Sequence, residues 1–363
     1  MQETPRRIRL TLSPQAGKYA RRDAPREARL LAARGALPLP PAEIATVLFA
    51  LLHDPDPEVK SCARDSLEGL PAPILEQVLA GDVHPALLAH FAQHYRDKEP
   101  YLERIALNAN VDDATLAFLA GRPLRRIVDL ISHNQERLQR APDIVEALGE
   151  NPLTGRAVID RILTFVGDTP ASSREDEPES IDEAQALAAL RAVLGEELSL
   201  HAEALIAEPE SEEQAAEAAA QDAALGRHNL PQIISGLSVF QKIKLARMGN
   251  REARGLLVRN RNKIVAISAV TNPKITENEL IAIAQSRAVC DEVIRVSAGK
   301  REVTRSYPAK LALTTNPKTP QAVAMKFVNY LQDRDLRNLM KSKDVPSVIS
   351  AHARRVLTKK GRL

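Results

Sequence analysis

The sequence of 363 residues contains no tryptophan, and aromatic residues make up only 3% of it. Because 44% of the residues are nonetheless hydrophobic, a core must be built mainly from leucine, isoleucine, valine and alanine. Sheet sandwiches are enriched in aromatic and β-branched residues, whereas alanine and leucine favour helices. The near absence of aromatic residues therefore predicts an all-α protein with many thin, closely packed helices.

Cysteine and glycine are scarce as well. The two cysteines, Cys62 and Cys290, lie far apart in the sequence, which excludes a local metal knuckle or redox pair and favours buried thiols in a reducing compartment. The 15 glycines do not cluster, and the sequence has no phosphate loop, dinucleotide fingerprint or Gly-x-Ser-x-Gly motif. We therefore expect a protein that is not an enzyme and that holds no cofactor or metal.

Long apolar runs are also missing. No stretch of about 18 apolar residues occurs in the sequence, so we expect no membrane span. The N-terminus, with Arg6, Arg7 and Arg9, lacks the apolar segment of a signal peptide. Together these absences predict a cytoplasmic protein.

Charge, by contrast, is abundant and unevenly distributed. Residues 1–167 carry 21 basic and 22 acidic residues, residues 168–226 carry 2 and 16, and residues 227–363 carry 27 and 9. The net charge of the whole chain is only +3, but the last segment alone has a net charge of +18 and the middle segment −14. Such segregation indicates separate segments with separate surfaces.

The length and the charge pattern predict two helical domains joined by an acidic linker. A proline-rich break at residues 37–41 ends the Arg-rich start of the chain, and residues 172–180 lack the large hydrophobic side chains that ordering requires. The expected organisation is a basic, partly disordered N-terminal segment (1–41), an N-terminal helical repeat domain (42–167), an acidic, partly disordered linker (168–229) and a basic C-terminal helical repeat domain (230–363).

Several helix starts are recognisable from their capping residues. Asp56 precedes Pro57, and an N-cap aspartate accepts hydrogen bonds from the free N–H groups of the first turn, where proline is best tolerated. The segments Ser238–Gln241 and Thr276–Glu279 match the capping box, in which the first and fourth side chains bond each other's backbone N–H groups. These signals predict helices that begin directly after Asp56, Ser238 and Thr276.

The clearest repeat is a short helix that stops at Asn-Pro and is followed by a threonine. It occurs at residues 268–276 (SAVTNPKIT) and at residues 311–320 (LALTTNPKTP). Proline pushes the preceding residue out of the helical conformation, so Asn-Pro ends one helix, and a threonine shortly after it can cap the next. We expect Thr276 and Thr319 to be these caps.

Weaker copies of the repeat occur at Asn108 and Asn151, and Asn250, Asn272 and Asn316 are separated by multiples of 22 residues. Each unit is a pair of helices that cannot bury its apolar face alone. Stacking of neighbouring units buries that face. The repeat therefore predicts an α-solenoid in two blocks.

This pattern resembles leucine-rich-repeat-variant and HEAT-like α-helical repeats. Residues 54–59 (DPDPEV) followed by residues 62–64 (CAR) are similar to a HEAT repeat, and the resemblance covers residues 42–165 and 240–358. It implies a curved, armadillo-like helical stack that binds other proteins. Some variant repeat proteins hold an iron–sulfur cluster on a group of cysteines, and this sequence has no such group.

Two histidines give a local hint of a metal site. His90 and His94 are four residues apart, share a helix face and have the spacing of zinc ligands, and His84 lies nearby. No glutamate stands between them in the metalloprotease pattern, and no obvious third ligand follows. We therefore interpret these histidines as exposed or helix-capping residues.

The basic residues of the C-terminal half form the most distinctive candidate site. They fall into three clusters and produce a positive field that attracts anions. The predicted partner-binding residues are Arg251, Arg254, Arg259, Arg261, Lys263, Lys300, Arg301, Arg305, Lys341, Lys343, Arg354, Arg355, Lys359 and Lys360.

Three interpretations of this basic surface are open: a docking face for an acidic protein, a surface for nucleic acid or anionic lipid, and a solvated face without a partner. Only Phe240, Tyr307, Phe327 and Tyr330 are aromatic in this half, which is few for stacking on nucleic-acid bases. We therefore predict a non-enzymatic scaffold or adaptor that binds a protein. The alternative is a nucleic-acid-associated protein that binds the phosphate backbone.

The acidic segment 168–226 is tethered beside the basic half, which gives it a high effective local concentration. We hypothesise that it folds back and masks the basic surface until a partner displaces it. Deleting residues 172–222 should therefore strengthen the retention of the protein on heparin or DNA at low salt. Unchanged retention would contradict the masking hypothesis.

Overall fold

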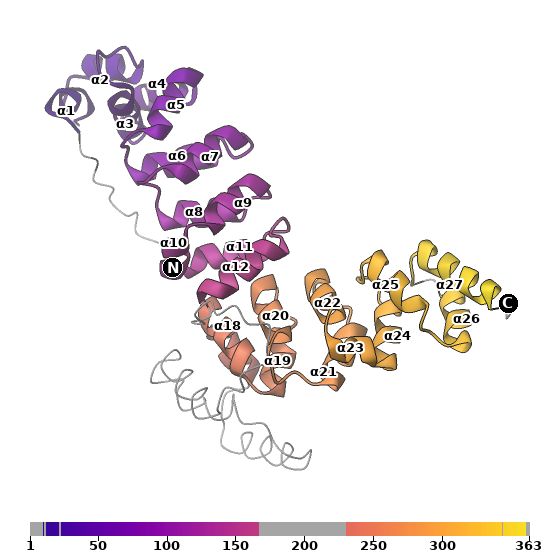
Figure 1. The fold of residues 1–363 in the computed structure, drawn as a ribbon. Helices are drawn as coiled ribbons and strands as arrows, with labels where there is room; N and C mark the ends of the chain where they lie inside the picture. Colours follow the sequence, from indigo (N-terminus) through magenta and orange to yellow (C-terminus); the bar gives the residue numbers. More distant parts are fainter. Residues whose placement is uncertain (1–9, 11, 22, 167–229, 343, 361–363) are drawn as a thin grey trace. The chain divides into compact units, whose positions relative to one another are not determined.

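The computed structural model describes residues 10, 12–21, 23–166, 230–342 and 344–360. Within these ranges its regular secondary structure consists of 23 α-helices and no β-strand, which confirms the prediction of an all-α protein (Figure 1). No helix in the described ranges is both long enough and apolar enough to cross a membrane. The acidic linker expected at residues 168–229 lies outside the described residues, and so does any masking contact that it makes.

The chain divides into two compact units, Met1–Leu153 and Thr154–Leu363. The helices of the first unit are α1 (Pro14–Ala20), α2 (Arg26–Ala33), α3 (Pro41–Leu51), α4 (Pro57–Glu68), α5 (Ala72–Ala80), α6 (Pro85–His94), α7 (Glu99–Leu107), α8 (Asp113–Ala120), α9 (Arg125–Ser132), α10 (Gln135–Arg140) and α11 (Pro142–Glu150). Those described in the second unit are α12 (Arg156–Val166), α17 (Leu230–Gly236), α18 (Val239–Met248), α19 (Arg251–Leu257), α20 (Lys263–Val270), α21 (Glu277–Gln285), α22 (Asp291–Ala298), α23 (Arg301–Arg305), α24 (Tyr307–Thr315), α25 (Gln321–Val328), α26 (Asp333–Lys341) and α27 (Ser347–Lys359).

Both ends of the expected N-terminal domain, residues 42–167, differ from the observed unit. The first unit ends at Leu153, and α12 belongs to the second unit, where it packs against α20. We predicted the boundary at residue 167, and so included α12 in the first domain, because the charge pattern changes only after that residue. At the other end, α1 and α2 pack against α3, so the part of segment 1–41 that the structure describes is integrated into the first unit.

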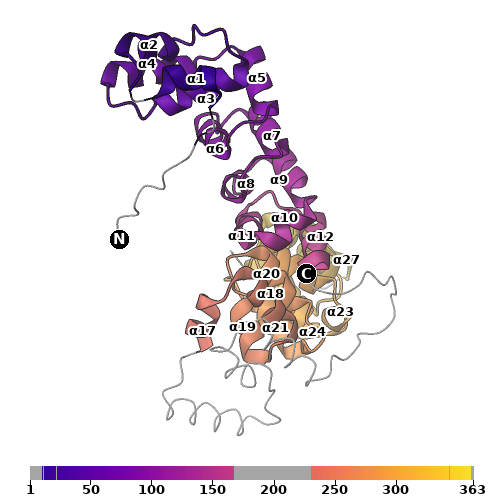
Figure 2. The same ribbon diagram turned by 90° about the vertical axis from the view of Figure 1, so that its left-hand side faces the viewer.

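Neighbouring helices form two rows in each unit. In the first unit α8 packs against α6 and α11, while α7 packs against α5 and α9 (Figure 2). In the second unit α20 packs against α18 and α22, and α25 packs against α27. The helices α19, α21, α24 and α26 lie along the opposite side of this unit, where α21 packs against α24 (Figure 1).

The buried side chains are those that the composition predicts. Leucine, isoleucine, valine and alanine make up nearly all of the core, and the aromatic residues buried within it are Phe49, Phe91, Tyr95 and Phe327. In the second unit one apolar cluster joins α25, α26 and α27 around Leu336, which is fully buried. Aliphatic burial of this kind supplies most of the stabilisation of short helices, which are marginal in isolation.

The helix starts predicted from capping residues are confirmed, with one exception. The side chain of Asp56 accepts a hydrogen bond from the N–H of Glu58, and both segments Ser238–Gln241 and Thr276–Glu279 form complete capping boxes. Thr319 does not cap α25, because the helix begins one residue later than expected and Pro320 occupies the N-cap position. Its buried hydroxyl has no hydrogen-bond partner among the described residues.

A buried asparagine recurs at the end of four helices and makes the same set of hydrogen bonds each time. The side-chain amide of Asn316, which follows α24, donates to the carbonyl oxygens of Ala284 and Ser286 at the end of α21, at 2.7 and 3.0 Å. Its side-chain oxygen accepts from the N–H of Lys318 at 3.0 Å. The equivalent contacts are made by Asn108, Asn151 and Asn272, which donate to the ends of α5, α8 and α18.

Each of these asparagines therefore connects the ends of two helices that pack side by side in one row. The weak copies of the repeat at Asn108 and Asn151 are confirmed as structural equivalents of Asn272 and Asn316. Asn250 is not an equivalent, because it is the N-cap of α19 and its side chain accepts from the N–H of Ala253. The asparagines spaced by multiples of 22 residues therefore have two different roles: Asn250 caps a helix, whereas Asn272 and Asn316 connect two helices.

Replacing Asn316 with alanine should lower the free energy of unfolding by about 1–3 kcal/mol, because the buried carbonyl oxygen of Ala284 loses its donor and the partly buried carbonyl oxygen of Ser286 loses a hydrogen bond as well. Urea denaturation followed by circular dichroism measures this change. Asn338→Ala on α26 is the matched control, since Asn338 is exposed and should change stability by about 0.5 kcal/mol or less. Equal effects of the two substitutions would contradict the role assigned to Asn316.

Candidate functional site

A groove with a volume of about 170 Å³ lies between α19, α20 and α21 of the second unit. It brings together three of the predicted partner-binding residues, Arg251, Arg254 and Arg259, around a largely apolar lining. The apolar side chains that line it are Val258, Ala269, Ile275, Ala282, Ile283 and Val289.

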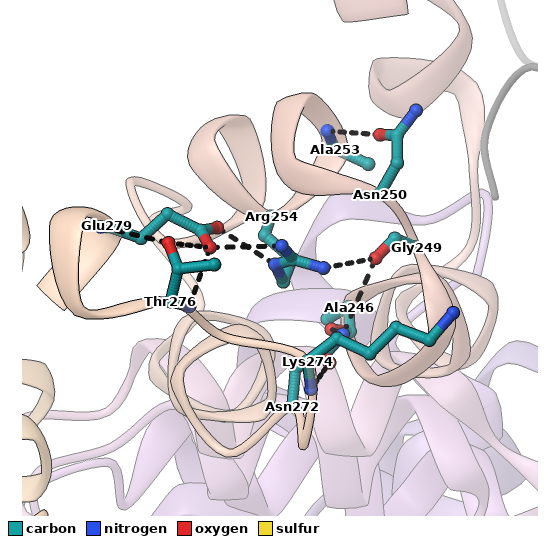
Figure 3. Close-up of polar contacts among 9 residues, drawn as sticks. All are labelled: Ala246, Gly249, Asn250, Ala253, Arg254, Asn272, Lys274, Thr276 and Glu279. Atoms are coloured by element: carbon teal, nitrogen blue, oxygen red, sulfur yellow. Dashed lines mark hydrogen bonds and ion pairs between the residues drawn. The ribbon is translucent and has the colours of Figure 1, made fainter. Parts of the chain in front are cut away.

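The deepest charged group of the groove is the ion pair between Arg254 and Glu279 (Figure 3). The guanidinium of Arg254 donates from Nε and Nη2 to the two carboxylate oxygens of Glu279, at 2.9 and 3.0 Å. The two side chains are only 2% and 11% exposed. A bidentate pair of this kind fixes both planar groups and cancels both charges within the groove wall.

The same arginine is tied to the asparagine contact that joins α18 to α20. Arg254 donates from Nη1 to the carbonyl oxygen of Gly249 at 3.0 Å, and Asn272 donates to the same oxygen at 3.5 Å (Figure 3). A side chain at Gly249 would place its Cβ 2.5 Å from the carbonyl oxygen of Leu245. Gly249 is therefore required by close backbone packing, and the groove is anchored to it.

Glu279 has two roles at the start of α21. Besides pairing with Arg254, its carboxylate accepts from the N–H of Thr276 at 2.9 Å and completes the capping box. Burial raises the pKa of Glu279, but the hydrogen bonds from Arg254 and Thr276 outweigh burial and hold this pKa below its ordinary value. The carboxylate is therefore charged at neutral pH.

Arg251 and Arg259 stand at the rim of the groove, and both are exposed. Within the part of the chain that the structure describes, neither guanidinium has an acidic partner. Since Glu279 is already neutralised by Arg254, these two arginines leave the groove with a net positive lining. Such a lining attracts anionic groups.

Arg254 corrects the prediction that all the basic residues lie at the surface, because it is 2% exposed and neutralised. Lys263 pairs with Glu292 at 3.4 Å and Lys360 pairs with Asp333 at 3.3 Å. Burial lowers the pKa of Lys300, whose side chain is half-buried. Ion pairs within the protein therefore neutralise part of the positive charge that the sequence of the C-terminal half carries.

The other predicted residues are distributed over several helices and do not line the groove. Arg261 lies in the loop between α19 and α20, and Lys343 lies outside the described residues. The remaining six are exposed and lie on α23, α26 and α27; they are Arg301, Arg305, Lys341, Arg354, Arg355 and Lys359.

The histidines of α6 lie in the first unit, and one of them is a cap. His84 accepts a hydrogen bond from the N–H of Ala86 at 3.1 Å, which confirms its capping role. The rings of His90 and His94 are stacked with centroids 6.5 Å apart. His90 packs against Phe49, and burial is the main cause of its lowered pKa. Among the described residues, no group of three metal-ligating side chains gathers here or elsewhere.

Comparison of the chain with protein-family models, with curated proteins and with solved structures found no match. The groove therefore has to be interpreted from its own chemistry. Sequence reasoning identified Arg251, Arg254 and Arg259 but missed Glu279, whose place in the capping box was the available signal. It also missed the apolar lining, which α19, α20 and α21 assemble from separate segments.

Replacing Arg254 with methionine should lower the free energy of unfolding by about 3–5 kcal/mol, because the carboxylate of Glu279 is then left charged and unpaired in a buried position. The double variant Arg254→Met/Glu279→Gln should recover most of this loss, since glutamine keeps the capping box and removes the charge. Urea denaturation of both variants measures the difference. Arg251→Met, at an exposed arginine of the same helix, is the control.

The pH dependence follows from the lowered pKa of Glu279. Unfolding restores its ordinary pKa of about 4.5, so the unfolded state binds more protons between the two values. The stability that the ion pair contributes is present above that ordinary pKa and is lost as the pH falls through the folded pKa. The double variant should therefore lose less stability than the wild type on acidification, and parallel pH profiles would contradict the ion-pair assignment.

Proposed function

We propose that the protein is a non-enzymatic adaptor of the HEAT-like or leucine-rich-repeat-variant type, an α-solenoid that binds another protein through its basic C-terminal half in the cytoplasm. The observation that carries the proposal is the groove between α19, α20 and α21. There an apolar lining lies directly beside two exposed arginines that have no acidic partner among the residues the structure describes. Protein interfaces combine apolar cores with arginine in this way.

The recurring asparagine contact supports the repeat part of the proposal. Asn108, Asn151, Asn272 and Asn316 make equivalent hydrogen bonds between neighbouring helices of a row. A repeated device that links each helix to the next is typical of repeat proteins, in which every unit contacts its neighbours and exposes a long face. Long faces of this kind bind macromolecules rather than enclosing a reaction centre.

Binding of nucleic acid is the second candidate function. It is favoured by the net charge of +18 over residues 227–363 and by the exposed basic residues of α23 and α27, which do not line the groove. Such a surface would bind the phosphate backbone without reading the bases. The groove does not favour this candidate, because none of its lining residues is aromatic.

Charge reversal beside the groove distinguishes the two candidates. The variant Arg259→Glu/Arg261→Glu should fail to retain a protein that the wild-type chain retains from a cell extract at about 0.5 M salt, because reversal introduces like charges against an acidic partner while general attraction is screened. Lys263 is left unchanged, since its reversal would place a carboxylate beside Glu292. The matched control is Arg354→Glu/Arg355→Glu on α27, which should retain the partner.

Nucleic-acid binding gives a different result in the same variants. The affinity for a labelled DNA duplex would fall steeply with rising salt, and both double reversals would weaken it to a similar extent, because phosphate contacts spread over the surface contribute independently. That outcome, without a protein retained at high salt, would replace the adaptor function with the alternative.

A further inference from the structure

The groove between α19, α20 and α21 has the size for one aliphatic side chain. Its volume is about 170 Å³, and an apolar protein cavity of about 150 Å³ is enough to take up a benzene molecule. Val258, Ile275 and Ile283 supply apolar contacts, while no lining residue offers an aromatic ring for stacking with a nucleobase. The lining therefore fits a leucine-sized side chain better than a base.

Gly255 keeps this groove open although the fold does not require a glycine there. It lies inside α19, and glycine is a poor helix former. A Cβ atom added at Gly255 would meet no atom within 4 Å, in contrast to Gly249, where close backbone packing excludes a side chain. The missing side chain of Gly255 therefore leaves space for a ligand instead of relieving a contact within the protein.

The charges around the groove are arranged for an acidic ligand. Arg251 and Arg259 are exposed at the rim, and Glu279 is the single acidic residue of the lining. An unpaired carboxylate at this position would repel an acidic ligand, and the ion pair with Arg254 removes that repulsion. The three arginines and one glutamate leave a net positive lining beside the apolar space.

We infer that this groove is the docking site for an acidic peptide segment of a protein partner. One aliphatic side chain of the segment enters the space left by Gly255, and acidic residues on either side of it bind Arg251 and Arg259. The inference rests on the proposed function and adds the chemistry of the recognised segment to it. The affinity that comes from burying the aliphatic side chain of the segment does not depend on salt, whereas the contacts with the exposed Arg251 and Arg259 weaken as the salt concentration rises.

The probe for this inference is the fluorescein-labelled peptide Gly-Ser-Glu-Leu-Glu-Ser-Gly, titrated with the full-length protein and followed by fluorescence anisotropy. One matched peptide has alanine in place of leucine, and another has glutamine in place of both glutamates. Loss of the leucine should weaken binding about tenfold or more, because burying a leucine side chain alone is worth at least that factor. Loss of the two glutamates should weaken binding by a smaller factor that shrinks as salt rises, because the arginine contacts are exposed.

A variant of the protein tests the groove without changing any charge. Gly255→Leu fills the space from within α19 and should weaken binding of the leucine peptide about tenfold or more. Gly236→Leu is the matched control, since Gly236 is also an exposed helical glycine with no atom within 4 Å of an added Cβ, but it does not line the groove. The control should bind the peptide as the wild type does.

Equal affinity of Gly255→Leu and the wild type for the leucine peptide would overturn the inference, and so would the absence of binding at about millimolar protein. If the groove fails in this way while Arg259→Glu/Arg261→Glu still loses its protein partner, the proposed function survives without the groove. A third outcome is binding of DNA or RNA that charge reversal abolishes but that Gly255→Leu leaves intact. This outcome would overturn the inference that the groove binds a peptide, and it would favour the nucleic-acid alternative.

Discussion

The carbonyl groups at the ends of packed helices are the constraint on which this architecture depends. An α-helix leaves its last four C=O groups without an internal partner, and those that a neighbouring helix covers cannot turn to water. One asparagine at each contact meets this need, and its amide donates both to one such oxygen in the last turn of an earlier helix of the row and to a carbonyl oxygen just beyond the end of that helix; these residues are Asn108, Asn151, Asn272 and Asn316. The side-chain oxygen of each asparagine also accepts a hydrogen bond from the backbone N–H two residues further on. One asparagine therefore orients the ends of two helices and the turn that follows the asparagine.

The geometry of the groove depends on one of these asparagine contacts, the one that Asn272 makes with the end of α18. The carbonyl oxygen of Gly249 receives both Asn272 and Arg254, so the amide that ties α18 to α20 also fixes the arginine that pairs with Glu279. Glu279 in turn caps α21. The walls of the groove are thus held by a continuous set of hydrogen bonds that runs from the end of α18 to the start of α21, and the apolar side chains between them are positioned by the fold rather than by a ligand.

Much of this arrangement could be predicted from the sequence, because local rules govern it. The helical class, the caps at Asp56, Ser238 and Thr276 and the importance of Asn272 and Asn316 all follow from neighbouring residues. Thr319 was misassigned because the distance from asparagine to threonine is one residue shorter than in the copy ending at Thr276. The partners of the asparagine amides could not be predicted, since they lie more than twenty residues earlier and depend on how the helices stack.

Charge is where sequence reasoning was weakest, for a physical reason. A net charge counts every guanidinium and ammonium equally, but Arg254, Lys263 and Lys360 are paired with acidic residues of other helices. The attraction that reaches a partner comes from the groups left unpaired, and its specificity depends on what lies beside them. Arg251 and Arg259 differ from the basic residues of α23 and α27 because they border an apolar space that Gly255 leaves unfilled. A positive electrostatic field alone attracts anions of any kind, whereas a positive field beside an apolar groove favours anionic ligands that also carry an aliphatic group.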